Sequence, residues 1–505
     1  MADLHLAVDR SRGGLAGQIA GELREAIRSG RLGRGARLPA SRDLARDLGL
    51  SRGVVVEAYE QLVAEGFLDA RVGVGTRVAS GPVTRAEPGL AVRSDEPGAN
   101  YYGHRPTSPD LSAFPRQAWL AAIRHVLATL PGDCLDYGDP GGVAELRAEL
   151  AAYLRRVRAA DTDTGEVVVV TGVAQGLSLV VRALVESGAG RAAADGDHGP
   201  LPAASDGAAP AAIGGESEGA VSEGAVSEGA VSEGAVSEGA VLLAVEEPTS
   251  PRQLPLLRRA GARLTGVPVD AEGIDVAALA RTGARAVLLT PAHHYPTGVV
   301  LSPRRRAELI AWAADTGAVI LEDDYDAEFR FDREPIGCLQ GLAPDRVVLA
   351  GSVSKALAPG LRLGWLVAPP AVAAAVRRAR GELDLGSPVI DQYALARFLS
   401  TGGYDRHLRR MRREYRRRRD ALVGALAEHL PGVRAHGISA GLHLYAELPA
   451  GWDERRVAEA ARACGLTVDP LPSALVIGFA RFPEHRIAEA VRQLRVLTDR
   501  QDVRT

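Results

Sequence analysis

Short apolar runs alternate with Ala- and Arg-rich helical stretches from about residue 106 to the end of the chain. The runs have the length of buried strands, and they cover residues 167–170, 241–245, 286–290, 318–321, 347–350 and 363–367. Strands that alternate with helices in this way predict an α/β domain around a largely parallel sheet. Ligand sites in open sheets of this kind lie at the carboxyl ends of the strands. The residues directly after each run are therefore the first candidates for function.

The first 80 residues have a different pattern. Apolar residues recur at helical spacing in three segments, which Gly30, Gly49 and Gly66 are placed to end. Ser51 is placed to cap the third helix. Two strand-like segments then flank a glycine-rich hairpin. Three helices followed by a hairpin predict an α+β winged helix-turn-helix domain over residues 1–80.

Two segments lack the periodicity of either domain. Residues 81–105 are rich in Pro, Gly, Ser and charge, which predicts a flexible linker. Within the larger domain, Ser-Glu-Gly-Ala-Val is repeated five times up to Val241, in a low-complexity stretch over 188–241. One valine in five residues buries too little surface to order a chain, so this stretch is predicted to be a disordered insertion. The larger domain is then expected over residues 106–505.

Composition narrows the class of protein. Three cysteines are too few and too scattered for a disulfide framework or a zinc site, and no metal site is predicted. The first residues have neither a basic nor an apolar leader, and no apolar run approaches the roughly 18 residues that span a bilayer. We expect a cytoplasmic protein without a membrane partner. The net charge of -3 does not exclude DNA binding, because a DNA-binding module can be a small part of an acidic chain.

Lys355 is the single lysine of the chain, among 60 basic residues. Arginine serves as well as lysine in salt bridges and phosphate contacts, but it does not lose its proton to become a nucleophile. Lysine can, and it forms a Schiff base with an aldehyde such as that of pyridoxal phosphate. A leftover lysine in an Arg-biased chain is the alternative. The neighbouring residues favour the cofactor.

Candidates for each part of a pyridoxal phosphate site occur in the sequence. Asp323 and Tyr325 follow a predicted strand and could contact the ring nitrogen and the phenolic oxygen. The turn at residues 171–176 joins a strand to a helix, and its backbone amides could seat the phosphate. The lysine loop adds hydroxyl groups and a guanidinium from Ser352, Ser354 and Arg362.

These motifs carry a family resemblance. Ser352-Val353-Ser354-Lys355, followed by Pro359-Gly360-Leu361-Arg362-Leu363-Gly364, resembles the lysine loop of fold-type I aminotransferases. With Arg37-Leu38-Pro39-Ala40-Ser41-Arg42 and Leu50-Ser51-Arg52 at the N-terminal end, nearly the whole chain resembles the MocR subfamily of GntR transcription regulators. The resemblance implies a multidomain protein, in which a winged helix precedes an α/β fold-type I aminotransferase-like domain with pyridoxal phosphate as its cofactor.

The resemblance also assigns roles to residues. It implies that Lys355 forms the Schiff base, that Asp323 and Tyr325 contact the cofactor ring, and that the phosphate contacts are Ser352, Ser354, Arg362, Ala174 and Gln175. Tyr137 resembles the tyrosine that reaches the phosphate of a neighbouring subunit. A homodimer is therefore implied, which is head-to-tail in this subfamily.

Three departures from the aminotransferase pattern concern the substrate. Ser250 occupies the place of an aromatic residue that stacks on the ring, and Tyr295 precedes Pro-x-Gly where an asparagine is usual. The strand at 475–480 has no arginine for a substrate carboxylate. These losses permit cofactor binding but weaken the grip on an amino acid. They favour a sensor with weak or absent transaminase activity.

The DNA contacts are expected at the start of the third helix and around it. In a helix-turn-helix the N-terminal residues of the second helix of the motif face the bases of double-stranded operator DNA. The candidates are Arg42, Ser51, Arg52, Arg71 and Gly73. A second basic segment, 404–420, has nine arginines against three acids and is predicted to be one long helix. A solvated face and a sequence-independent DNA contact both remain open for that segment.

The leading hypothesis is a dimeric transcription regulator that senses pyridoxal phosphate or an amino compound through an aldimine at Lys355. One alternative is a pyridoxal-phosphate-dependent aminotransferase with an appended DNA-binding module. Another is a plain DNA-binding repressor whose large domain is only a dimerisation scaffold. The sequence leaves open the effector, the operator and the direction of regulation.

Overall fold

The computed structural model describes residues 6–11, 13–71, 75–79, 105–188, 240–331, 336–437 and 440–500. The chain separates into two compact units, Met1–Gly98 and Ala99–Thr505. The wing tip expected at Gly73, residues 81–104 of the expected linker and residues 189–239 of the expected insertion lie outside the described residues.

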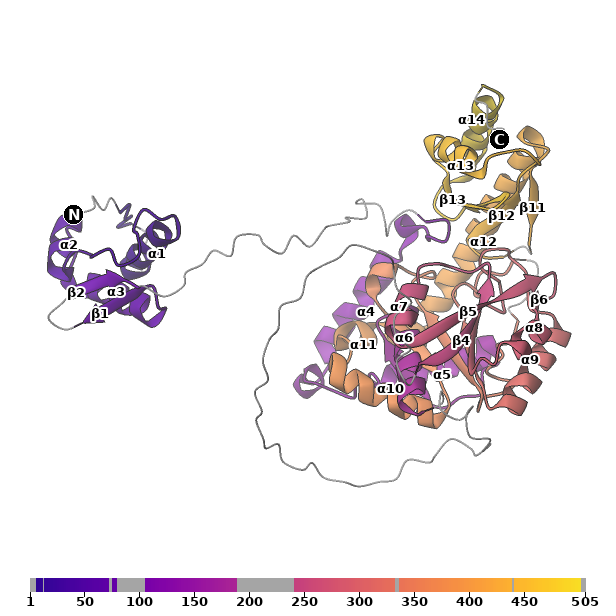
Figure 1. Ribbon diagram of the computed structural model, residues 1–505, viewed down its shortest axis with the longest axis horizontal. Helices are drawn as coiled ribbons and strands as arrows, with labels where there is room; N and C mark the ends of the chain where they lie inside the picture. The colour runs from indigo at the N-terminus through magenta and orange to yellow at the C-terminus, as the bar shows by residue number, and fades with distance from the viewer. Residues whose placement is uncertain are drawn as a thin grey trace, which may run out of the picture. The chain divides into compact units, whose positions relative to one another are not determined.

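The N-terminal unit consists of three helices followed by a two-stranded antiparallel sheet (Figure 1). Its elements are α1 (Leu15–Arg28), α2 (Ser41–Leu48), α3 (Arg52–Ala64), β1 (Leu68–Arg71) and β2 (Gly75–Val78). The helices bury the apolar residues of the periodic pattern, and Ile19 and Leu23 are both fully buried. Gly49 ends α2 with a φ of 60°, a conformation that glycine adopts without strain. The predicted winged helix-turn-helix order is confirmed.

The capping prediction for α3 is confirmed in its position but not in its hydrogen bond. Ser51 directly precedes α3, as expected of a capping residue, but its side chain makes no capping hydrogen bond. Ser51 is instead exposed beside the start of α3. Its hydroxyl group therefore makes no hydrogen bond to the first turn of the helix and can contact a partner.

The second unit is built around an eight-stranded sheet. In spatial order the strands are β3 (Val167–Val170), β10 (Gly364–Val367), β9 (Val347–Ser352), β8 (Val319–Asp323), β7 (Ala286–Leu289), β4 (Val241–Glu247), β5 (Ala262–Asp270) and β6 (Gly273–Ile274). The strands from β9 to β5 run parallel, which confirms a largely parallel sheet. By contrast, β10 is antiparallel to both of its neighbours. The loop between β9 and β10 carries no helix of the length that a parallel crossover needs.

Helices cover both faces of this sheet. They are α4 (Arg116–Thr129), α5 (Ala144–Arg158), α6 (Val173–Glu186), α7 (Leu254–Arg259), α8 (Val276–Arg281), α9 (Pro303–Thr316), α10 (Pro370–Leu383) and α11 (Val389–Ser400). Strand β3 shows how the faces are filled. Val168 and Val170 join the core with α6 and α10, whereas Val167 and Val169 join the core with α5 and α11. All four valines are buried, as expected for a strand covered on both sides.

The chain continues into a smaller C-terminal layer, which lies at the top of Figure 1. Helix α12 (Gly403–His429) leads to a four-stranded antiparallel sheet in the order β11 (Arg434–His436), β12 (His443–Glu447), β14 (Ala474–Gly478) and β13 (Thr467–Leu471). Helices α13 (Glu454–Ala463) and α14 (Glu484–Arg500) complete the layer. Its apolar residues belong to the same core cluster as α4, α5 and α11.

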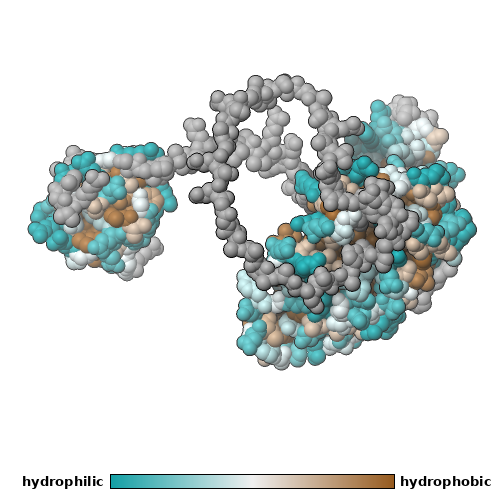
Figure 2. Space-filling view, turned by 60° about the horizontal axis from the view of Figure 1, so that its bottom comes forward, coloured by the Kyte–Doolittle hydropathy of each residue, from teal (hydrophilic) through white to brown (hydrophobic). Residues whose placement is uncertain are grey.

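The surface carries scattered apolar patches among hydrophilic residues (Figure 2). Within the described part of the chain, no helix combines the length and the apolar character needed to span a membrane. Exposed large apolar side chains include Leu120 and Leu127, seven residues apart on α4, and the nearby chain adds Leu135. A spacing of seven residues places two side chains on the same face of a helix.

Candidate cofactor and DNA-binding sites

Lys355 lies in the turn after β9, before the short 3-10 helix at Pro359–Leu361. Its Nζ donates a hydrogen bond to Thr107 Oγ1 at 3.1 Å. Burial lowers the pKa of Lys355 to about 8, although the nearby carboxylates of Asp326 and Asp323 act in the opposite direction. A large share of the amine is therefore unprotonated at pH 8. That form is a nucleophile, which the always-charged guanidinium of an arginine is not.

Asp323 ends strand β8 and is buried. One carboxylate oxygen, Oδ2, accepts a hydrogen bond from Gln253 Nε2 at 3.1 Å. The other oxygen, Oδ1, is buried and has no hydrogen-bond partner among the described residues. Burial raises the pKa of Asp323 to about 6, so the carboxyl group is mostly ionised at neutral pH. A buried carboxylate with an unsatisfied oxygen fits the protonated ring nitrogen of pyridoxal phosphate.

Tyr325 is two residues further along the same loop. Its hydroxyl group is 3.2 Å from His293 Nδ1, which is in turn 3.0 Å from Asp326 Oδ2. Burial, together with the charge of Asp326, raises the pKa of Tyr325 well above its usual value. The phenol therefore stays protonated and can donate a hydrogen bond. His293 and Asp326 hold it in place.

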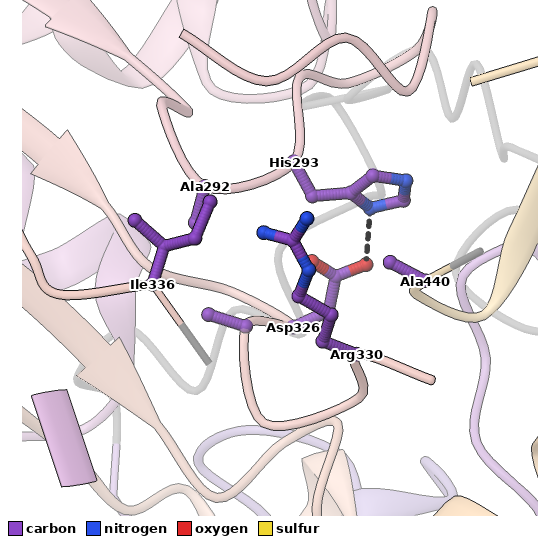
Figure 3. A pocket seen from close by; sticks show the side chains of 7 residues that line it. Ala292, His293, Asp326, Arg330, Ile336 and Ala440 are labelled. Carbon is purple, nitrogen blue, oxygen red and sulfur yellow. Dashed lines mark hydrogen bonds and ion pairs between the residues drawn. The ribbon is translucent and has the colours of Figure 1, made fainter. Parts of the chain in front are cut away.

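A small pocket lies beside this group of side chains (Figure 3). It is lined by Ala292, His293, Asp326, Ala327, Arg330, Ile336 and Ala440. Figure 3 shows the His293–Asp326 contact as a dashed line, with Arg330 among the side chains that line the same pocket. His443 contributes a third group, and ligand-type atoms of His293, Asp326 and His443 lie within 4.8 Å of one another. The guanidinium of Arg330 adds a positive charge to the lining of this pocket, which disfavours the binding of a metal cation there.

The expected phosphate end of the site lies at the start of α6. Gly172 precedes this helix with a φ of 135°, and a Cβ there would lie 3.4 Å from two guanidinium nitrogens of Arg362. Ala174 and Gln175 are in the first turn of the helix, so their backbone N–H groups have no earlier carbonyl within the helix. Free amides at a helix N-terminus beside an exposed arginine favour an anion.

The side chain of Gln175 has another use. Its Oε1 accepts a hydrogen bond from Thr171 N at 2.9 Å, and its Nε2 donates to Asp384 at 2.8 Å. Gln175 could thus offer only its backbone amide to a phosphate. Ser352 is buried at the end of β9, and its Oγ accepts a hydrogen bond from Ser354 N at 3.3 Å.

Tyr137 differs from the other expected cofactor residues because its side chain is 82% exposed. Its backbone N–H donates to the Asp136 carboxylate at 2.7 Å, which shapes the local turn. An aromatic side chain exposed to this extent is available to another copy of the chain.

The departures from the aminotransferase pattern have visible consequences. Tyr295 lies with its ring centre 6.4 Å from that of Tyr325 and 5.2 Å from that of His443. At the sequence position where the aminotransferase pattern has an asparagine, an aromatic ring therefore packs beside Tyr325 and His443. In strand β14, a Cβ on Gly478 would lie 2.5 Å from Pro106 O. The N-terminal segment of this unit fills the space at that strand.

The N-terminal unit brings together the starts of two helices. Arg52 Nε donates to Ser41 Oγ at 3.5 Å, so the first turns of α3 and α2 are neighbours. Arg42, Ser51 and Arg52 are all exposed there. Arg71 is the last residue of β1, next to the expected wing.

The basic segment at 404–420 forms part of one helix, α12, as predicted. Not all of its arginines face solvent: Arg418 is buried in an ion pair with Asp110 at 2.9 Å, and Arg412 donates to the Glu328 carbonyl at 2.5 Å. The exposed arginines of this segment are Arg406, Arg409, Arg410, Arg413, Arg416 and Arg417. Their spacing of three and four residues places them along one helix face.

Several residues around Lys355 and Asp323 were not predicted from the sequence. Thr107 contacts the lysine from 248 positions away, and Gln253 contacts Asp323 from 70 positions away. Nothing in the local sequence marks such contacts. Asp326 carried a usable signal, because it follows Asp323 and Tyr325 in the same loop after a strand.

Comparisons with known proteins agree with this organisation. Residues 15–78 match the family described as bacterial regulatory proteins, gntR family, and residues 224–494 match aminotransferase class I and II. The chain is 32% identical to the HTH-type pyridoxine biosynthesis transcriptional regulator PdxR of Corynebacterium glutamicum, over 88% of this chain and 85% of that protein. The chain belongs to the MocR subfamily of GntR regulators. Other relatives include the probable rhizopine catabolism regulatory protein MocR of Rhizobium meliloti, 28% identical over 95% of this chain and 92% of that protein.

Solved structures give the fold of the second unit. A multiple substrate aminotransferase from Thermococcus profundus has a TM-score of 0.62 and 23% identity, and the match covers 79% of this chain and 91% of that chain. The second unit of this MocR-type regulator is thus a fold-type I aminotransferase-like α/β domain with a large mixed sheet, and pyridoxal phosphate is its cofactor. Like other GntR-family regulators, the protein is a DNA-binding transcription regulator.

Proposed function

We propose that this regulator changes its DNA binding according to what is bound at Lys355. The observation that carries the proposal is a buried lysine of lowered pKa beside a carboxylate with an unsatisfied oxygen, in a chain that also has a winged helix. We assign residues 1–80 to DNA binding, 81–105 to a linker and 106–505 to the ligand-sensing domain, with an insertion at 188–241. The ligand is pyridoxal phosphate itself or an amino compound that reacts with it.

Each part of the site has a proposed task. Pyridoxal phosphate, when bound, supplies an aldehyde that captures amines covalently. Lys355 provides the amine that holds the cofactor, and Asp323 keeps the proton on the ring nitrogen through its free oxygen. Tyr325 donates to the phenolic oxygen. The phosphate is proposed to bind at Arg362, Ser352, Ser354 and the amides of Ala174 and Gln175.

A homodimer completes the proposed site. Tyr137 is exposed within its own chain and is proposed to reach the phosphate in a second copy, arranged head-to-tail. The exposed side chains of Leu120 and Leu127 give α4 an apolar face that a second copy can cover. A dimer also places two winged helices on one DNA operator, where Arg42, Ser51, Arg52, Arg71 and Gly73 are the proposed contacts.

The residues at the positions where aminotransferases hold their substrate favour sensing over transamination. Strand β14 has no arginine, and Pro106 fills the space beside Gly478. Ser250 cannot stack on the cofactor ring. The site can thus hold the cofactor, while it lacks two usual means of orienting an amino acid for repeated turnover.

The test is a titration of the full-length protein with pyridoxal phosphate, followed by absorbance and by binding to the DNA beside its gene. We expect an imine absorbance band in the wild type, no band in Lys355→Arg, and operator affinity that depends on the cofactor only in the wild type. Operator binding that is identical with and without cofactor would refute the proposal. Steady transfer of amino groups to a keto acid, abolished by Lys355→Arg, would replace it with the aminotransferase alternative.

A further inference from the structure

The exposed side of helix α12 carries a row of arginines, which we call the α12 basic face. Its members are Arg406, Arg409, Arg410, Arg413, Arg416 and Arg417. With about 3.6 residues per turn and about 1.5 Å per residue, these positions lie within about a third of the helix circumference and along about 17 Å of its length. The whole chain has 63 acidic and 60 basic residues, so the row is a local excess of positive charge in a nearly balanced chain.

The opposite side of α12 holds this face in place. Leu408, Met411 and Tyr415 are buried in the core of the second unit. Arg418, also buried, pairs with Asp110 at 2.9 Å. The helix therefore presents the α12 basic face to solvent from a fixed backbone.

Four members of the face have no ion pair with an acid in the described part of the chain: Arg406, Arg409, Arg410 and Arg413. Arg406 and Arg410 donate to main-chain carbonyl oxygens, at 3.0 and 2.7 Å, which satisfies donors without cancelling the charge. By contrast, Arg417 pairs with Glu414 at 2.7 Å and with Glu484 at 2.9 Å. The uncompensated charge is therefore concentrated over about two turns of the helix.

This arrangement works against the stability of the helix. Arg406 and Arg410 are four residues apart, as are Arg409 and Arg413, so the guanidinium groups of each pair are neighbours on the helix surface. Like charges at that spacing destabilise a helix. An anionic partner bound to the face would offset this repulsion.

Double-stranded DNA fits both the charge and the length of the α12 basic face. A duplex carries one phosphate charge per about 1.7 Å of its axis, so about 17 Å of duplex carries about ten phosphates. The N-terminal module has little excess charge of its own, because residues 1–80 contain 12 arginines against 10 acids. Phosphate contacts supply essentially all of sequence-independent DNA binding. A DNA-binding regulator with so modest a charge on its module gains affinity from a second surface that contacts phosphates.

We propose that the α12 basic face binds the phosphate backbone of DNA without reading its sequence. The winged helix selects the operator, and the second unit adds affinity through charge. Arginine suits this task because its guanidinium can donate to two phosphate oxygens at once. The contact needs no change at Lys355, so it is separate from the proposed sensing of a ligand.

The test measures how DNA binding depends on salt, with the full-length protein saturated with pyridoxal phosphate throughout. Binding to the DNA beside the gene, and to a duplex of unrelated sequence and equal length, is followed between about 50 and 200 mM salt. Each phosphate contact adds about 0.9 to the slope of log affinity against log salt. Arg409→Gln combined with Arg413→Gln should lower the slope by about 1.8 on both duplexes. The difference in affinity from the wild type should then shrink about tenfold over that range.

Three controls separate a phosphate contact from other effects. Arg409→Lys with Arg413→Lys keeps both charges and should keep most of the wild-type slope. Arg258→Gln with Arg259→Gln removes two exposed arginines of α7, an equal change in net charge, and should leave the slope unchanged. The Arg409→Gln, Arg413→Gln variant should unfold at the wild-type temperature or above it, because repulsion within the row is reduced.

Four results would overturn the proposal. A wild-type slope in the Arg409→Gln, Arg413→Gln variant would show that the face is only solvated surface. A loss confined to the operator would indicate base recognition instead of a phosphate contact. An equal loss in the α7 variant would make net charge responsible, and not this face. A change in oligomeric state, measured by sedimentation, would assign the face to a contact between copies of this chain.

Discussion

The DNA-binding module and the cofactor site use charged residues in opposite ways. In the module, Arg42 and Arg52 are exposed at helix starts, above a core made of apolar residues. In the proposed cofactor site, Lys355 and Asp323 lie inside the domain, and burial has shifted both pKa values toward neutral pH. Recognition of a large anionic partner needs charge at the surface, whereas covalent chemistry needs groups whose protonation can change.

This difference predicts how substitutions behave. An exposed arginine in the module can be replaced without disturbing the core, so DNA affinity and stability should vary independently. A buried group in the cofactor site interacts with several others, and its loss leaves a partner unsatisfied. Function and stability should therefore change together in that domain.

Lys355→Arg should have the largest effect on cofactor binding. Arginine keeps the positive charge but cannot attack the aldehyde, so the affinity for pyridoxal phosphate should fall by about 100-fold or more. Absorbance titration measures this loss. The variant should keep its affinity for DNA in the absence of cofactor. Retention of the imine band would show that another amine is used, although Lys355 is the single lysine of the chain.

Asp323→Asn should weaken cofactor binding by roughly 10- to 100-fold, because a neutral amide no longer pairs with the protonated ring nitrogen. The wild type should also bind less tightly as the pH falls through about 6, where its raised pKa lets Asp323 take up a proton. The variant should lack that loss. Affinity measured from pH 5 to 8 tests both statements. Asp315→Asn, at an exposed position on α9, is the control.

Arg52→Gln tests the exposed side of the comparison. Loss of one guanidinium contact at the start of α3 should reduce operator affinity about tenfold, the range expected for a specific base contact. The free energy of unfolding, measured by thermal unfolding, should stay within about 0.5 kcal/mol of the wild-type value because the side chain is at the surface. Arg31→Gln, also exposed but beyond the end of α1, should affect neither property. A large loss of stability in Arg52→Gln would break the proposed separation.

Glu246→Gln should have the smallest effect on function and a visible effect on pH dependence. Burial raises the pKa of Glu246 to about 8, against hydrogen bonds from Thr290 that favour the charged form. The folded state therefore holds a proton that the unfolded state releases above its ordinary value of 4.5. Stability should fall as the pH rises from about 4.5 to 8, by up to about 1.4 kcal/mol per pH unit. Chemical unfolding of the variant should show a flatter profile, with cofactor affinity unchanged.

The sequence predicted where several residues of the proposed site lie relative to the strands. Asp323 and Lys355 follow predicted strands, and the alternation of strands and helices fixes which edge of the sheet they share. The sequence did not predict Thr107 or Gln253, because their contacts depend on how distant segments pack. The direction of β10 was also missed, since strand direction depends on the connection and leaves no mark in the strand itself.

Gly478 is a second example of a contact between distant segments that the sequence did not predict. The sequence indicates that strand 475–480 lacks an arginine, and from this it predicts a weaker hold on an amino acid. The structure adds that Pro106 fills the space at residue 478. Its neighbour Thr107 accepts a hydrogen bond from the lysine, and its neighbour Arg105 lies close to Asp469. The folded chain therefore brings a distant segment against this strand, which the sequence of the strand does not indicate.

The most direct measurement follows the cofactor and the DNA in one sample. The full-length wild type is titrated with pyridoxal phosphate, then with an amino compound, while the imine band and operator affinity are recorded together. Lys355→Arg is treated in the same way. The account predicts that operator affinity changes in step with the cofactor spectrum in the wild type and stays constant in the variant. Operator affinity that is unaffected by either addition in the wild type would contradict it.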